Sequence, residues 1–162
     1  MDFNKQKLNE IKESLGYLQD EMEALKYMAG TMAFDKAPEG QSEAIVDLIA
    51  LIDHAQVSYF RPAIEGITRN SPKRTFEIEV DFRDTFNIKF EDEYGSVDKL
   101  LNKVIKHRAA LLSVVNRIPP IEWERKGVIK GKSRSVFQIL TELVHFEKKQ
   151  LKLIADRVKS GG

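Results

Sequence analysis

Apolar residues near the start of the chain follow the repeat of an amphipathic helix. They recur at alternating intervals of three and four positions, which is the a/d spacing of helices that lie along one another in a bundle. The pattern predicts one long helix over residues 3–32. Its apolar positions are Leu8, Ile11, Leu15, Leu18, Met22, Leu25, Ala29 and Met32.

A second helical pattern follows a turn at residues 35–40. Ser42 is a candidate N-cap for a helix over about 43–66. Pro62 falls inside this pattern, and proline lacks an amide hydrogen and clashes with the preceding turn. We therefore expect a kink or an early end near residues 59–61. The apolar positions are Ile45, Leu48, Ile49, Ile52, Tyr59, Phe60 and Ala63.

Residues 68–95 depart from the helical pattern. Apolar and polar side chains alternate there with a period of two, interrupted by a short polar break at residues 83–85. This alternation predicts a small two-stranded hairpin. The alternative is an extended crossover that packs its phenylalanines onto the bundle. The alternating apolar residues are Phe76, Ile78, Val80, Phe82, Phe86, Ile88 and Phe90.

Two further helices are predicted in the second half of the chain. One begins after Ser96, covers about 97–117 and stops before Pro119. The other covers about 136–158, and Ser135 with Gln138 forms a capping-box pattern at its start. A polar loop over about 119–134, which contains Trp123, is expected to separate them.

These four helical segments predict an all-α fold, a four-helix bundle. At 162 residues the chain is expected to form a single domain, 1–162. The link over about 68–95 is long enough to run the length of the bundle as a crossover between the second and third helices. The bundle therefore need not have a simple up-down-up-down topology.

Composition narrows the functional classes. The chain has no cysteine, which excludes disulfides, a thiolate nucleophile and thiolate-bound metals. The formal charge is 26 − 25 = +1, which argues against nucleic acid as a partner. No apolar run approaches the roughly 20 residues that span a bilayer, so no membrane partner is expected. The charged N-terminal segment does not resemble a signal peptide, and we expect a cytoplasmic protein.

The chain has three histidines, the number that a catalytic zinc or nickel site needs. On helical wheels, with about 100° per residue, His54 and His145 fall opposite the apolar stripes and His107 lies on a flank. Bundle metal sites are built from inward-facing side chains. Solvated surface histidines are thus the simpler interpretation. The alternative is a site in an open cleft between the second and fourth helices that uses His54 and His145.

Three polar residues fall on the apolar stripes instead: Gln56, Arg108 and Glu147. Charged side chains are rarely buried unless they are paired. We therefore predict an Arg108–Glu147 contact, joined by Gln56, as a polar layer inside the bundle. One interpretation is an ion pair that fixes helix register. The other is the polar floor of a ligand pocket.

A basic cluster precedes the fourth helix. Its four members and the glycines among them could hold an anion at the helix N-terminus. The spacing does not match a phosphate-binding loop, and a solvated basic loop is the simpler interpretation. The cluster comprises Lys126, Lys130, Lys132 and Arg134.

From about residue 42 to 158 the chain resembles the DinB/YfiT-like superfamily of bacterial four-helix-bundle proteins. The resemblance rests on the order of elements and on residues 48–56, 104–108, 123–127 and 146–154. It implies a divalent metal held by one histidine of the second helix and two, four residues apart, of the fourth. Some relatives are thiol-dependent transferases that act with low-molecular-weight thiols, and others are known as stress- or damage-induced proteins.

Carried onto this chain, the ligand positions of that superfamily hold Leu51, Phe146 and Gln150. None of these residue types ligates a divalent metal well. A shift of one residue on the fourth helix places His145 on the first ligand position but Lys149 on the second, and a cationic lysine is no ligand. His54 would then have to serve from a displaced turn. Both registers leave the metal site incomplete.

The resemblance thus implies a stress- or damage-response-type protein that has lost the three-histidine metal site, with no cofactor. Such a protein would be non-enzymatic or would bind a small molecule. The alternative is a divalent-metal-dependent thiol S-transferase or hydrolase that uses His54 and His145 with zinc or nickel, so the residues leave both an enzyme and a non-enzyme open. A homodimer formed through helix faces is a third possibility.

Overall fold

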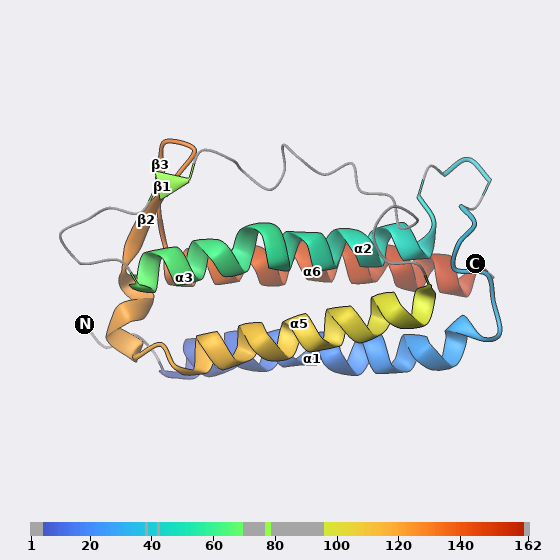
Figure 1. Ribbon diagram of the computed structural model, residues 1–162, viewed down its shortest axis with the longest axis horizontal. Coiled ribbons are helices and arrows are strands. Elements are labelled where there is room, and N and C mark those ends of the chain that lie inside the picture. The colour runs from blue at the N-terminus through green and yellow to red at the C-terminus, as the bar shows by residue number, and fades with distance from the viewer. Residues whose placement is uncertain (1–4, 38, 42, 70–76, 79–95, 161–162) are drawn as a thin grey trace.

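The computed structural model describes residues 5–37, 39–41, 43–69, 77–78 and 96–160. Four helical rods lie lengthwise beside one another (Figure 1), which confirms the predicted all-α four-helix fold. The rods are α1 (Lys5–Ala29), the continuous run α2 (Ile45–Ala55), η1 (Gln56–Phe60) and α3 (Arg61–Arg69), then α5 (Val97–Asn116) and α6 (Val136–Lys159).

The direction of the rods gives the bundle its topology. In Figure 1, α1 and α6 run one way along the bundle, whereas the α2–α3 rod and α5 run the other way. The chain leaves α3 at one end and begins α5 at the opposite end, so the link between them spans the bundle, as expected. No helix in the described part of the chain is long and apolar enough to cross a bilayer.

Side-chain caps define where the helices start. Ser96 Oγ accepts a hydrogen bond from the Lys99 amide (3.2 Å) at the start of α5. At α6, Ser135 Oγ accepts from the Gln138 amide (3.1 Å) and Gln138 Oε1 accepts from the Ser135 amide (2.8 Å), so the predicted capping box is confirmed. The N-cap of α2 is Ala44, two residues after the expected cap Ser42, which lies outside the described residues.

The second rod passes through Pro62 without ending, and the expected early end is wrong. A π-helical turn, η1, precedes the proline, and the Arg61 amide donates to the Gln56 carbonyl five residues back. Proline clashes with the carbonyl four residues before it, here that of Ser58. The wider π turn relieves this crowding, and the rod continues to Arg69.

The segment 119–134, which was expected to be a loop, contains regular secondary structure, so that prediction is wrong. It forms the 3-10 turn η3 (Pro120–Glu124) and the antiparallel strands β2 (Lys126–Ile129) and β3 (Lys132–Ser135). The two turn residues between these strands both have positive φ, 48° at Lys130 and 80° at Gly131, as in the tightest hairpin turns.

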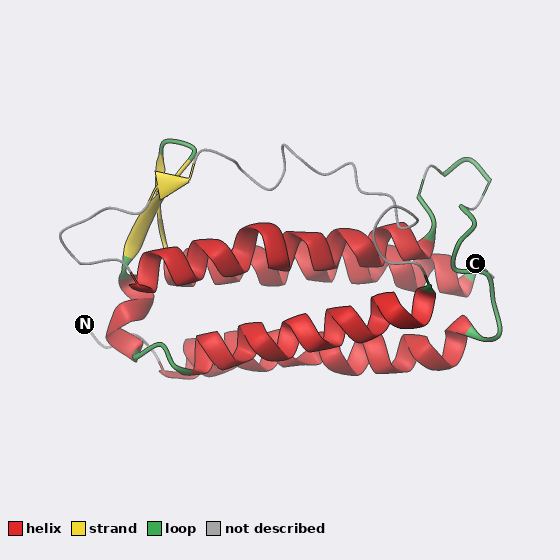
Figure 2. Cartoon of the chain, in the orientation of Figure 1, coloured by secondary structure: helices red, strands yellow, loops and turns green. Residues whose placement is uncertain are grey.

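A short strand from the crossover joins this hairpin. β1 (Glu77–Ile78) pairs in parallel with β2, which completes a three-stranded sheet at one end of the bundle (Figure 2). The rest of the hairpin predicted over residues 76–90 lies outside the described residues. The sequence pattern therefore located a strand in the crossover but not its partner, which follows α5.

The core consists of two apolar clusters, one toward each end of the bundle. On α1 the division falls between Leu15 and Leu18, and on α5 it falls between Val104 and Leu111. Trp123, fully buried from η3, belongs to the cluster near the sheet, and its Nε1 donates to the Ile118 carbonyl (3.2 Å). The residues between the two clusters include most of the buried polar side chains.

Candidate functional site

A single buried guanidinium joins all four rods at the centre of the bundle. Arg108 of α5 has no exposed surface. Its Nη1 donates to Glu147 Oε1 of α6 (2.8 Å) and to the Leu15 carbonyl of α1 (3.0 Å), while Nη2 donates to Glu147 Oε2. Its Nε donates to Gln56 Oε1 of η1 (3.0 Å). The structure thus brings together the three residues predicted for a polar layer.

The layer continues from Gln56 toward the surface. Gln56 Nε2 donates to Asp53 Oδ1 (2.9 Å) and, more weakly, to the Val104 carbonyl (3.4 Å). The buried Asp53 carboxylate also lies 2.9 Å from His107 Nδ1, and the His107 side chain is one-third exposed. Asp53 was not among the predicted residues. The sequence could have identified Asp53 by its spacing, because it lies three residues before Gln56 and therefore on the same face of the helix.

Burial and pairing act in opposite directions on the acid of this layer. Burial raises the pKa of the Glu147 carboxyl above its ordinary value, and the Arg108 guanidinium opposes that rise. Glu147 and Gln56 are both almost fully buried and both are hydrogen-bonded within the layer. The arrangement is that of a buried network between two apolar clusters, and only its outer member His107 is partly exposed.

The three histidines lie in different environments. His54 is half-buried on α2, with its Nδ1 3.4 Å from Ser58 Oγ, His107 meets Asp53, and His145 is exposed on α6. Among the described residues, which include all three, no group of three histidine, aspartate or glutamate side chains is placed to hold a metal ion. Within that part of the chain, neither His54 nor His145 belongs to a group of three such side chains.

The positions that the resemblance would assign to metal ligands are Leu51, Phe146 and Gln150. Phe146 packs against both apolar clusters, and its ring centroid lies 6.4 Å from that of Phe60. Leu51 is half-buried, and Gln150 is buried. Two of these three side chains are hydrocarbon, so the residues present do not fit a divalent metal.

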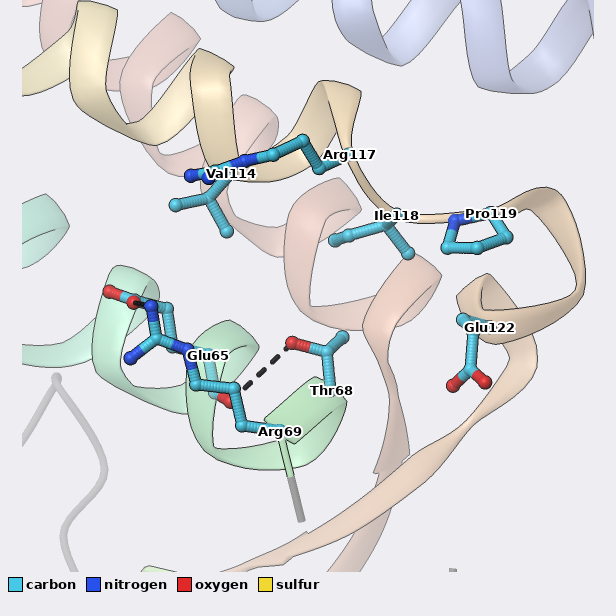
Figure 3. A pocket seen from close by; sticks show the side chains of 8 residues that line it. All are labelled: Glu65, Thr68, Arg69, Val114, Arg117, Ile118, Pro119 and Glu122. Carbon is cyan, nitrogen blue, oxygen red and sulfur yellow. Dashed lines mark hydrogen bonds and ion pairs between the residues drawn. The ribbon is translucent and has the colours of Figure 1, made fainter. Parts of the chain in front are cut away.

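A pocket opens where α3 and α5 end beside η3 (Figure 3). Its volume is about 320 Å³. One wall comes from the last turns of α3, and the other from the end of α5 and the residues that follow it. None of the three polar-layer residues lines it. The lining residues are Glu65, Thr68, Arg69, Val114, Arg117, Ile118, Pro119 and Glu122.

Ion pairs fix the carboxylates of this pocket. Glu65 lies between two arginines of its own helix, with Arg61 Nε and Arg69 Nη2 each 2.7 Å from one of its oxygens. Glu122 accepts from Arg125 Nη1 (3.1 Å), and the same nitrogen donates to the Thr68 carbonyl at the end of α3 (3.2 Å). The helix end and the turn are therefore tied together around the pocket.

The remaining lining side chains give the pocket an apolar wall and a cationic edge. Val114, Ile118 and Pro119 form the hydrocarbon surface. The exposed Arg117 donates from Nε to the Ser113 carbonyl (3.1 Å), and its side chain runs past Val114 (Figure 3). Helical periodicity did not identify this site, because it is assembled from helix ends that lie far apart in the sequence.

The predicted basic cluster lies on the β2–β3 hairpin. Lys126, Lys130 and Lys132 are exposed, and Arg134 pairs with Glu142 of α6 at 3.2 Å. None of the four lines the pocket.

A comparison with protein-family models and a search of curated proteins found no match to this chain.

Proposed function

We propose that this protein is a DinB/YfiT-like, stress- or damage-response-type bundle protein that binds a small ligand and does not use a three-histidine metal site. The pocket between the ends of α3 and α5 carries this proposal. Its volume, about 320 Å³, lies within the range of small-molecule sites. Three apolar side chains and five polar ones converge on it, so its lining is more polar than that of most small-molecule sites and suits a ligand with a polar or charged group.

The centre of the bundle supports the same proposal. A superfamily metal would require ligands where this chain has Leu51 and Phe146, whose hydrocarbon side chains cannot ligate one. The buried charged groups at the centre of the bundle, those of Arg108 and Glu147, are bonded to one another. Ligand binding is thus assigned to the end of the bundle and structural support to its middle.

A fragment screen read by two-dimensional amide NMR tests the proposal. We expect ligands to shift the amide signals of Thr68, Val114 and Ile118, which belong to the pocket. A Thr68→Phe variant fills the pocket and should abolish these shifts. Thr141→Phe is the matched control, because Thr141 is also half-buried, also donates to the carbonyl four residues back, and lies outside the pocket. Shifts that survive Thr68→Phe, or that cluster elsewhere, would overturn the proposal.

The rival function is a divalent-metal-dependent thiol S-transferase or hydrolase that uses His54 and His145. Elemental analysis of protein purified without chelator separates the two. We expect no stoichiometric metal that depends on these histidines. Stoichiometric zinc or nickel, lost in both His54→Ala and His145→Ala but retained in His107→Ala, would replace the proposed function with the rival.

A further inference from the structure

We propose that the ligand of the pocket is a small organic carboxylate whose hydrocarbon body packs on Val114, Ile118 and Pro119 and whose charge is bound by Arg117. This inference rests on the proposed function, because it names the chemical class of the ligand for the same pocket. It follows from which charges at the pocket are already neutralised and which surface remains apolar.

The charge around the pocket favours an anion. The lining carboxylates are Glu65 and Glu122, and the arginines bonded to them are Arg61, Arg69 and Arg125. Arg117 adds a fourth cation, so the local balance is 4 − 2 = +2. Since each carboxylate already has a cationic partner, an incoming ammonium group would have to compete with a guanidinium for it.

Arg117 is the cation placed to bind the ligand. Among the described residues no carboxylate pairs with it, and its one hydrogen bond there uses Nε and the Ser113 carbonyl. Both terminal nitrogens therefore remain as donors. A planar guanidinium matches a carboxylate through two parallel hydrogen bonds, which gives direction as well as charge.

The helix ends set a limit on how an anion can bind here. α3 and α5 both present their C-termini, whose partial negative charge disfavours anions. Arg125 offsets this at α3 by donating to the Thr68 carbonyl. The anion must therefore be held by side chains rather than by backbone amides. The apolar wall then favours an anion with a hydrocarbon body over a bare inorganic ion.

Titration of the full chain with matched acids and amides tests this inference. Hexanoate and phenylacetate are compared with hexanamide and phenylacetamide, and with inorganic phosphate, by the amide NMR signals of the pocket. We expect both acids to bind and both amides to bind far more weakly. Arg117→Gln should weaken the binding of the acids about tenfold or more, as expected for loss of a charged hydrogen-bonded partner.

The control for Arg117→Gln is Lys152→Gln. Lys152 is exposed on α6, well along the helix from the end that meets the hairpin. The control removes the same charge beyond the screening distance of about 8 Å and should leave the affinity for the acids unchanged. Because Arg117 is exposed, its variant should keep the circular dichroism spectrum of the parent chain.

Three results would overturn the inference. Equal binding of acids and amides at the pocket would show that the ligand class is wrong while the proposed function stands. Phosphate binding as tightly as the acids, with the same dependence on Arg117, would show a general anion site with no need for a hydrocarbon body. Failure of every acid, amide and screened fragment to shift the pocket signals would overturn both the inference and the proposed function.

Discussion

Individual residues at the centre of the bundle were predictable because charge on an apolar stripe is rare. Arg108 and Glu147 stand out on helical wheels for this reason, and the structure buries both and pairs them. The Asp53–His107 contact was not predictable in the same way. It depends on how α2 and α5 are rotated against each other, which the pattern within one helix does not determine.

Truncation of Glu147 tests how much the buried Arg108–Glu147 pair affects the free energy of unfolding. Glu147→Ala leaves the buried Arg108 guanidinium without its counter-ion, and we expect a loss of about 3–5 kcal/mol in the free energy of unfolding. Urea denaturation measures it. Glu142→Ala on the same helix is the control, because Glu142 pairs with the part-exposed Arg134 and should cost about 1 kcal/mol or less. Equal losses in the two variants would contradict a buried pair.

The raised pKa of Glu147 makes a separate prediction about pH. An unfolded glutamate titrates near 4.3, and burial raises the pKa of Glu147 in the folded chain. Between the two values the folded chain binds more protons, so this group's contribution to stability is complete below about pH 4.3 and decreases as pH rises through the folded pKa.

Glu147→Gln removes this titration and provides the reference. We expect the stability of the parent chain, measured relative to Glu147→Gln by urea denaturation, to decrease as the pH rises from about 4 toward 7. If the stability of the parent chain relative to Glu147→Gln instead increases over this range, pairing with Arg108 outweighs burial in setting the pKa of Glu147.

At the scale of elements, the helices were predictable and the sheet was not. The apolar stripes locate all four rods to within a few residues, and the serine caps fix the starts of α5 and α6. The β2–β3 hairpin was not predicted because each strand has only four residues, too few to show a period of two, and β3 consists entirely of polar residues. Its turn, Lys130-Gly131, also lacks the asparagine or aspartate that usually marks such turns.

The π turn before Pro62 explains why proline is tolerated inside a rod. Pro62→Ala should change the free energy of unfolding by less than about 1 kcal/mol, because the backbone has already adapted to the missing donor. Lys106→Pro places proline at an exposed site in the uninterrupted helix α5 and should cost about 3 kcal/mol or more. Denaturant midpoints report both changes. A large loss from Pro62→Ala would indicate that the proline itself stabilises the π turn.

At the scale of the whole molecule, the polar layer lies where the two apolar clusters meet. Apolar side chains in either cluster could slide past one another by a turn at modest cost, whereas Arg108 must meet Glu147, Gln56 and the Leu15 carbonyl together. Those partners belong to the other three rods. These contacts join all four rods at one level, so the register-fixing interpretation predicts that the layer specifies their alignment.

A double substitution separates register from stability. Arg108→Met and Glu147→Leu should each destabilise the chain strongly, because each leaves the partner's polar group buried and unpaired. The double variant removes both charges and should recover the part of the loss that comes from an unpaired charge, so the two effects will be far from additive. The loss that remains comes from Gln56 Oε1 and the Leu15 carbonyl, which no longer accept from Arg108. If the layer fixes register, the double variant will also show doubled or broadened amide NMR signals despite its partly recovered stability. Sharp single signals would mean that the apolar clusters align the rods by themselves.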